Sequence, residues 1–237
     1  IFNNLKNKSK YNKRKKEIEI FNKSNSILKK GIAITPVKFG ISFTTTHLNQ
    51  AGALVHIYTD GSIHLNHGGI EMGQGLMTKL ALVAANEFGL EIKDIKISST
   101  DTEKVANTSA SAASATTDLN GGAILNAIYN IKLELNAFIK KYYKTSKVIY
   151  KNGKIICDKK ILLFNNVIAK AYLNRVKLSS SGFYKTPKIN VNVKDLSGRP
   201  FLYFAYGAAV SEVIIDTLTG ENKLLQVDII HDVGNSI

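Results

Sequence analysis

The sequence predicts an α+β fold in which mixed sheets are flanked by helices, and three observations lead to this prediction. Short segments rich in Ile, Val, Thr and Phe have the composition of strands, and a few longer segments repeat apolar residues at helical spacing. The two kinds of segment do not alternate regularly, as they would in a parallel βαβ sheet. A length of 237 residues is enough for a sizeable core. No apolar run approaches the ~20 residues of a membrane span, so we expect no membrane partner.

The N-terminal third predicts a Lys-rich helix followed by strands. The helix is expected over residues 1–30, where Gly31 would end it. We expect this segment to lead from a preceding part of a longer protein. Strands are expected at residues 31–35, 39–45, 53–58 and 62–65. Pro36 separates the first two, and an Asp-Gly turn joins the last two as a hairpin.

The remainder predicts helices and strands in mixed order. Apolar spacing indicates a helix over residues 76–88, and a long amphipathic helix follows residues 107–118. The other expected elements are a strand at 92–98, a hairpin at 147–157, a helix at 162–172, a strand at 176–180, and paired strands at 201–216 and 223–231.

The charge is strongly basic, with a formal net charge of +14. Residues 1–30 alone carry ten Lys or Arg against Glu17 and Glu19. An acidic partner or nucleic acid is one reading of this segment, and a solvated helix face is the other. Nucleic-acid surfaces normally recruit Arg, of which the chain has three, so nucleic acid is the remote alternative.

A single cysteine, Cys157, excludes a disulfide framework and any cysteine-ligated cluster within this chain, and favours a cytoplasmic protein. His64 and His67 are three apart on an expected strand and face opposite sides, so they do not form a metal site. We therefore expect no metal held directly by protein side chains. The residues by themselves form no complete catalytic constellation.

Two loops stand immediately before helices. Residues 67–75 (HGGIEMGQG) place four glycines ahead of the helix at 76–88. Free amides and partial positive charge at a helix N-terminus suit an anion such as phosphate, although a merely tight turn explains the glycines equally well. Residues 107–118 contain six hydroxyls (Thr108, Ser109, Ser111, Ser114, Thr116 and Thr117). Plain N-capping needs only one of them, which favours a ligand loop.

Several motifs carry a resemblance to a known family. They are residues 38–44 (KFGISFT), 48–62 (LNQAGALVHIYTDGS), 67–75, 112–114 (AAS), 181–187 (SGFYKTP), 206–213 (YGAAVSEV) and 231–234 (HDVG). In these motifs the chain resembles the molybdenum-binding part of the xanthine dehydrogenase and aldehyde oxidase family. The resemblance is collinear over nearly the whole chain. It implies that residues 31–237 are a partial molybdopterin-binding domain, truncated at the C-terminus.

The resemblance also implies site residues. Met72, Gly73 and Gln74 match one cofactor-contacting loop, with Gln74 near the metal. The matching positions of the second loop are Ala112, Ala113, Ser114, Thr116 and Thr117. Phe43 and Thr44 match the substrate pocket, where an aromatic face and a hydroxyl would bind a purine.

The chemistry implied by the family is oxidation of xanthine or hypoxanthine to urate with oxygen from water. Electrons then pass through 2Fe-2S clusters and FAD to NAD, and these groups are expected on other domains or subunits. The family's glutamate base lies beyond Ile237, and other pocket residues lie before Ile1. We therefore expect no catalytic residue in this piece, no turnover by it alone, and a dimer for the complete enzyme. An aldehyde oxidase-type enzyme is the alternative.

Overall fold

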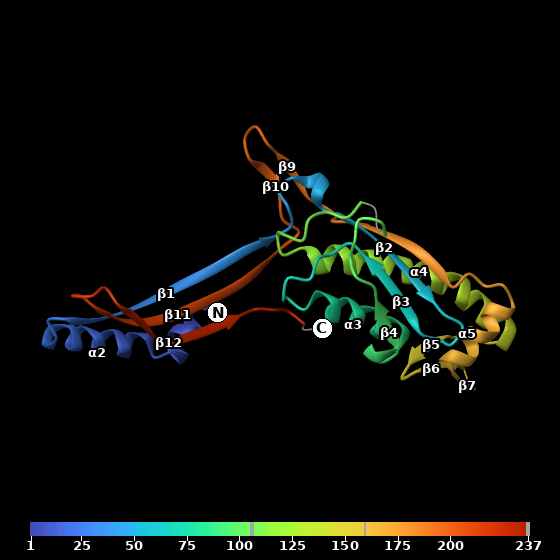
Figure 1. The fold of residues 1–237 in the computed structure, drawn as a ribbon, viewed down its shortest axis with the longest axis horizontal. Coiled ribbons are helices and arrows are strands. Elements are labelled where there is room, and N and C mark those ends of the chain that lie inside the picture. Colours follow the sequence, from blue (N-terminus) through green and yellow to red (C-terminus); the bar gives the residue numbers. More distant parts are fainter. Residues whose placement is uncertain (105–106, 159, 236–237) are drawn as a thin grey trace. The chain divides into compact units, whose positions relative to one another are not determined.

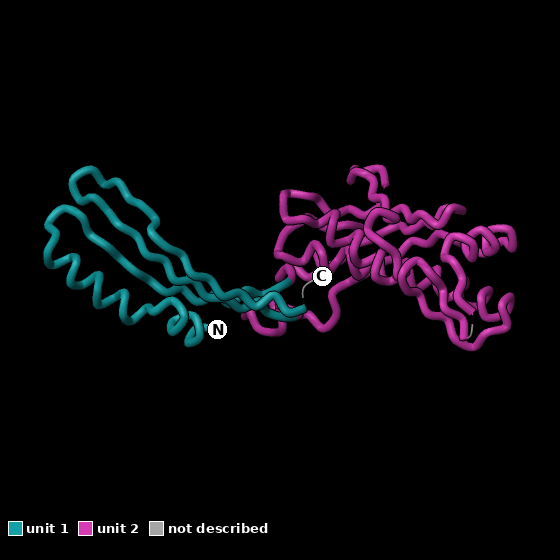
Figure 2. The backbone as a smooth tube through the Cα atoms, turned by 90° about the horizontal axis from the view of Figure 1, so that it is seen from below, with its two compact units in different colours: residues 1–41, 203–236 teal, residues 42–202, 237 magenta. Residues whose placement is uncertain are grey.

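The computed structural model describes residues 1–104, 107–158 and 160–235. The chain forms two compact units, shown in different colours in Figure 2. Unit 1 combines residues 1–41 with the segment that starts at Tyr203, and unit 2 spans residues 42–202. Helices and antiparallel-rich sheets occur in both units, which confirms the α+β prediction. No helix in the described residues is long and apolar enough to cross a membrane.

Unit 1 is a three-stranded antiparallel sheet with two helices (Figure 1). Its elements are α1 (Phe2–Lys8), α2 (Tyr11–Ser24), β1 (Leu28–Ile41), β11 (Tyr203–Asp216) and β12 (Asn222–His231), with strand order β1-β11-β12. Arg14 of α2 donates hydrogen bonds to Glu212 Oε2 at 2.8 Å and to Asp228 Oδ2 at 2.7 Å. These charge-assisted bonds fix α2 on β11 and β12. One of the three arginines is therefore committed to internal structure.

The single helix predicted for residues 1–30 is wrong in two respects. Lys10 adopts a left-handed backbone with φ 54°, which divides the segment into α1 and α2. The second helix ends at Ser24, so Gly31 lies inside β1 rather than at a helix end. Pro36 also lies inside β1, because an edge strand tolerates the missing N–H. The division into domains at residue 30 stays a prediction.

Unit 2 is built on a four-stranded sheet of order β4-β3-β2-β8. The strands are β2 (Gln50–Ile57), β3 (Ile63–His67), β4 (Ile95–Ile97) and β8 (Ser179–Lys185), and the main helices are α3 (Leu76–Phe88) and α4 (Thr116–Tyr143). Smaller elements are η1 (Thr46–Leu48), η2 (Ile92–Asp94), β5 (Ile149–Lys151), β6 (Lys154–Cys157), β7 (Lys160–Leu163), α5 (Phe164–Leu173), β9 (Asn190–Asn192) and β10 (Ser197–Arg199). α4 packs along β2 and β8 and against α3.

The core of unit 2 lies between the sheet and these helices. Its largest fully buried side chains include Phe88 of α3, Leu65 of β3 and Leu135 of α4. The helix predicted at 76–88 and the Asp-Gly hairpin are confirmed. The expected strand at 39–45 is wrong beyond residue 41, so Phe43 and Thr44 belong to a loop. Strands β7, β9 and β10 have no counterpart in the prediction.

Two adjacent glycines of α4 have opposite expected responses to alanine. A Cβ on Gly121 would lie 3.7 Å from Leu80, an ordinary contact, whereas a Cβ on Gly122 would lie 2.6 Å from Cγ of Tyr184. We expect Gly121→Ala to stabilise the fold by about 0.5–1 kcal/mol, since alanine favours a helix interior. Gly122→Ala should destabilise it by about 1–3 kcal/mol through overpacking. Urea unfolding of both variants checks this, and changes of the same sign would contradict it.

Candidate cofactor site

The two loops singled out in the sequence line one hollow of about 470 Å³ within unit 2. The residues that line it are Met72, Gln74, Lys79, Ser111, Ala112, Ala113, Ser114, Thr116 and Thr117. Seven of the eight predicted cofactor-binding residues are in this set, and Gly73 is not. The loops lie about forty residues apart in the sequence, so their convergence is a property of the fold.

Direct contacts hold the two loops together. The amide of Ile70 donates to Ser111 Oγ at 2.7 Å. A Cβ on Gly69 would lie 2.7 Å from Leu76 and 2.9 Å from Asn120, and a Cβ on Gly68 would overlap the side chain of Thr108. These glycines therefore allow the first loop to approach the second loop and α4. At these two positions the glycines serve close packing of the chain on itself, in agreement with the tight-turn alternative.

The N-terminus of α3 is occupied by the side chain of Glu71. Its Oε1 accepts hydrogen bonds from the backbone amides of Gly73 at 2.9 Å and Gly75 at 3.0 Å. Its Oε2 accepts a hydrogen bond from the backbone amide of Met77 at 3.0 Å. The bond from Met77, with those from the other amides, holds the pKa of this carboxyl below its ordinary value. The anion site predicted at this helix N-terminus is therefore filled by the chain's own carboxylate.

The N-terminus of α4 has Ala115 at its N-cap position, so the N-cap side chain makes no hydrogen bond, and the acidic residue Asp118 lies in its first turn. Ala113 and Ser114 precede it with φ 53° each, a left-handed backbone that costs about 1 kcal/mol per non-glycine residue. Thr116 and Thr117 in its first turn line the hollow. Strain of this kind gathers at ligand-binding loops, and the hydroxyls of these threonines can donate hydrogen bonds to a ligand.

Gln74 and Lys79 complete the wall formed by the first loop. Gln74 Oε1 accepts from the amide of Met72 at 2.6 Å, and Gln74 Nε2 donates to the carbonyl of Ile70 at 2.9 Å. The ammonium of Lys79, on α3, donates to the carbonyl of Gln74 at 2.8 Å. Lys79 and Ser111 were not among the predicted site residues. The sequence nevertheless offered a signal for each residue. Lys79 is a cation about one turn into the expected helix, and Ser111 belongs to the hydroxyl-rich loop.

His67 has a structural role in the first loop. Its ring is buried. The Nδ1 atom accepts a hydrogen bond from the backbone amide of Gly69 at 3.1 Å, and the Nε2 atom lies 3.2 Å from the sulfur of Met77. Burial lowers the pKa of this imidazole, so the neutral ring is favoured. In the described residues no group of three His, Cys, Asp or Glu side chains gathers as a metal site.

The predicted substrate residues do not line the same hollow. Thr44 lines a separate hollow of about 420 Å³ with residues of the 45–47 and 191–200 segments. Phe43 is half-buried, and its backbone is held by the side chain of the buried Asn49. The amide of Phe43 donates a hydrogen bond to Asn49 Oδ1, and Asn49 Nδ2 donates one to the carbonyl of Phe43, both at 2.8 Å. The assignment of Phe43 and Thr44 to a purine pocket stays a prediction.

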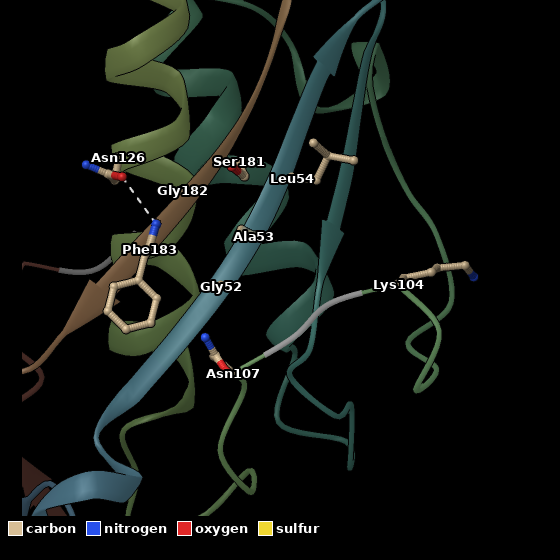
Figure 3. A pocket seen from close by; sticks show the side chains of 9 residues that line it. All are labelled: Gly52, Ala53, Leu54, Lys104, Asn107, Asn126, Ser181, Gly182 and Phe183. Atoms are coloured by element: carbon tan, nitrogen blue, oxygen red, sulfur yellow. Dashed lines mark hydrogen bonds between the residues drawn. The ribbon is translucent and has the colours of Figure 1, made fainter.

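A third hollow, also of about 420 Å³, lies between β2, β8 and α4 (Figure 3). Phe183 of β8 projects into this region, and its amide donates to Asn126 Oδ1 at 3.2 Å. Sequence reasoning did not identify this hollow as a candidate site, although the resemblance includes the motif around Phe183.

The hollow between the two loops fits a phosphorylated pterin. Its lining offers hydroxyl and amide donors and one ammonium group, which match the phosphate and ring heteroatoms of such a molecule. None of the nine lining residues is a carboxylate that would repel the phosphate.

Comparisons with known proteins agree with this arrangement. The family model for the molybdopterin cofactor-binding domain matches residues 4–237. The chain is 48% identical over 229 residues to xanthine dehydrogenase/oxidase of Felis catus, and 45% identical over 240 residues to xanthine dehydrogenase of Dictyostelium discoideum. The alignments cover 97% and 100% of the chain but 16% of each relative.

Solved structures share the fold. Quinoline 2-oxidoreductase of Pseudomonas putida 86 matches 98% of this chain with a TM-score of 0.78 at 17% identity, over 30% of its own chain. Aldehyde oxidoreductase of Desulfovibrio gigas matches 94% with a TM-score of 0.69 at 20% identity, over 22% of its own chain. The resemblance found in the sequence is therefore confirmed, and the chain belongs to the molybdopterin cofactor-binding domain family.

Proposed function

We propose that this chain is the part of a molybdenum hydroxylase that holds one side of the molybdopterin, and that the complete enzyme oxidises xanthine or hypoxanthine. The observation that carries the proposal is the convergence of residues 72–74 and 111–117 on one hollow. The names of the curated relatives, xanthine dehydrogenases at 43–48% identity, support purines as substrates.

The residues of this chain would bind and orient the cofactor, whose molybdenum supplies the oxidising centre when bound. Gln74 is pre-positioned by its bonds to Met72 and Ile70, so its placement needs little further ordering on binding. Ser114, Thr116 and Thr117 present hydroxyls from the other side of the hollow. Phe43 and Thr44 are proposed to contact a purine in the complete enzyme.

The rest of the proposal concerns the whole protein, of which the relatives' lengths imply that this chain is a small part. We propose 2Fe-2S and FAD modules on other domains or subunits, NAD as the electron acceptor, a dimeric assembly, a role in purine catabolism and a cytoplasmic location. Nucleic-acid binding by the N-terminal helices is not favoured, because Arg14 bonds Glu212 and Asp228 instead of solvent.

The experiment is to purify the complete polypeptide that contains these residues and to measure bound molybdenum, bound pterin and xanthine-dependent NAD reduction. Cofactor together with turnover of xanthine is the expected result. Cofactor with turnover of aldehydes only would overturn Phe43 and Thr44 as a purine site and favour the aldehyde oxidase-type alternative. Absence of cofactor would overturn the proposed function itself.

A further inference from the structure

The loop that carries Phe43 and Thr44 is exposed in its middle and buried at both ends. Residues 44–47 are exposed, whereas Ser42 is 4% exposed and Asn49 is 2% exposed. Both of these buried residues are polar, and the cost of burying a polar side chain is offset by its hydrogen bonds. The partners of Ser42 and Asn49 therefore show what fixes the exposed part of the loop.

The side-chain amide of Asn49 is fully used within this loop. Its Oδ1 accepts a hydrogen bond from the backbone amide of Phe43 at 2.8 Å. Its Nδ2 donates to the carbonyl of Phe43 at 2.8 Å and to the carbonyl of Thr46 at 3.2 Å. Both N–H donors of Nδ2 are thus used, and a carboxylate in the same place could not make these two bonds. The side chain of Asn49 fixes the backbone on both sides of Thr44.

The other end of the loop is held as well. Ser42 has φ 141°, a backbone conformation that is uncommon for a residue with a Cβ and persists only where its surroundings determine it. Its Oγ donates to the carbonyl of Pro200 at 3.1 Å and accepts from the amide of Leu202 at 3.4 Å. A loop held at both ends has little conformational freedom left to lose when a ligand binds.

We propose that Asn49 is a positioning residue for the substrate, because it holds the backbone from which the Phe43 ring and the Thr44 hydroxyl would recognise a purine. The inference rests on the proposed function and deepens it, since it assigns part of the substrate preference to a buried residue outside the hollow that Thr44 lines. A flat ring packs on an aromatic face, and a hydroxyl bonds a ring heteroatom only within a narrow range of distance and angle. Loss of the Asn49 bonds should therefore affect a purine more than a small aliphatic aldehyde, which has no ring.

The test uses the complete cofactor-loaded polypeptide with Asn49→Ala and Asn49→Asp. Aspartate has nearly the shape of asparagine but cannot donate when ionised, so it separates the loss of the two donated bonds from the loss of volume. The control is Asn22→Ala, because Asn22 of α2 holds Lys30 in the same manner. Asn22 Nδ2 donates to the carbonyl of Lys30 at 2.9 Å, and Asn22 Oδ1 accepts from its amide at 2.8 Å. The kcat and KM values for xanthine and for acetaldehyde are measured per bound molybdenum.

We expect the KM for xanthine to rise at least about tenfold in both Asn49 variants, in the range of one or two lost hydrogen bonds, with a smaller change in kcat. The ratio of kcat/KM for xanthine to kcat/KM for acetaldehyde should fall by a similar factor, and Asn22→Ala should keep the wild-type ratio. A general loss of stability would lower the amount of active enzyme for both substrates alike and leave this ratio unchanged.

A second measurement, on the wild type alone, does not depend on the folding of a variant. The amide of Phe43 donates to a buried side chain, so its hydrogen exchange should be at least about tenfold slower than in an unstructured peptide. Exchange of this amide at the unstructured rate would overturn the inference, as would a wild-type substrate ratio in both Asn49 variants. A wild-type enzyme that oxidises acetaldehyde but not xanthine would instead overturn the proposed purine substrate itself.

Discussion

Replacing Gly182 with alanine is expected to destabilise unit 2 by more than about 3 kcal/mol, the largest effect on stability that we predict. Gly182 lies on β8, where the strand runs beside α4 (Figure 3). An added Cβ would overlap the carbonyl oxygen of Ala123 and lie 2.5 Å from the amide nitrogen of Ala127. Both neighbours are helix backbone, which cannot move aside as a flexible side chain can.

The consequence reaches the candidate site, because displacement of α4 moves the loop that precedes it. We expect a low soluble yield and rapid proteolysis of Gly182→Ala. Ser181→Ala is the matched control, since it alters the exposed neighbour on the same strand. A Gly182→Ala protein as soluble and protease-resistant as Ser181→Ala would contradict the close packing of β8 on α4.

Replacing Glu71 with glutamine is expected to loosen the first loop, the largest local effect that we predict. In the wild type both carboxylate oxygens of Glu71 accept hydrogen bonds from the amides of Gly73, Gly75 and Met77. Glutamine has no negative charge and replaces one of these oxygens with an NH₂ group, which cannot accept. Hydrogen exchange of a peptide covering these residues should become at least about tenfold faster. Glu134→Gln removes an equal charge from an exposed position on α4 and should leave this exchange unchanged.

The same carboxylate predicts a pH dependence. Bonds from the amide of Met77 and its neighbours lower the pKa of Glu71 in the folded protein from its ordinary value of 4.5. A lowered pKa means that this stabilisation is fully present above pH 4.5 and is lost as the pH falls through the folded pKa. Exchange of the loop, corrected for its intrinsic rate, should therefore accelerate below pH 4.5 in the wild type but not in Glu71→Gln.

The sequence was sufficient for the elements whose local signals are strong. The helix from Leu76 to Phe88 has apolar residues at regular spacing and a glycine on each side, and both of its ends were predicted correctly. The split at Lys10 was not predictable in this way, because a left-handed lysine has no local signature. Short strands such as β9 and β10 lack enough alternating residues to be recognised.

The candidate site was predictable from the resemblance, but its electrostatics were not. Spacing alone left an anion site and a tight turn as equal alternatives at the start of α3. In the structure the carboxylate of Glu71 binds the amides that an anion would need. The contribution of Lys79 depends on the side of α3 that faces the second loop, which only the packing of α3 against α4 decides. Gly68 and Gly69 similarly depend on contacts with Thr108 and Asn120, which lie 40 and 51 positions away in the sequence.

The most direct test of the central claim is the cofactor content of the complete polypeptide after the hydroxyls of the second loop are removed by Ser114→Ala, Thr116→Val and Thr117→Val together. The control removes three exposed hydroxyls of unit 2 outside the hollow, by Ser99→Ala, Thr59→Val and Thr102→Val. If the two loops jointly hold molybdopterin, the first variant should lose about nine tenths or more of its molybdenum and pterin, in the range expected for three lost hydrogen bonds, while the control keeps both. Equal cofactor content in the two variants would contradict the assignment of this hollow as the cofactor site.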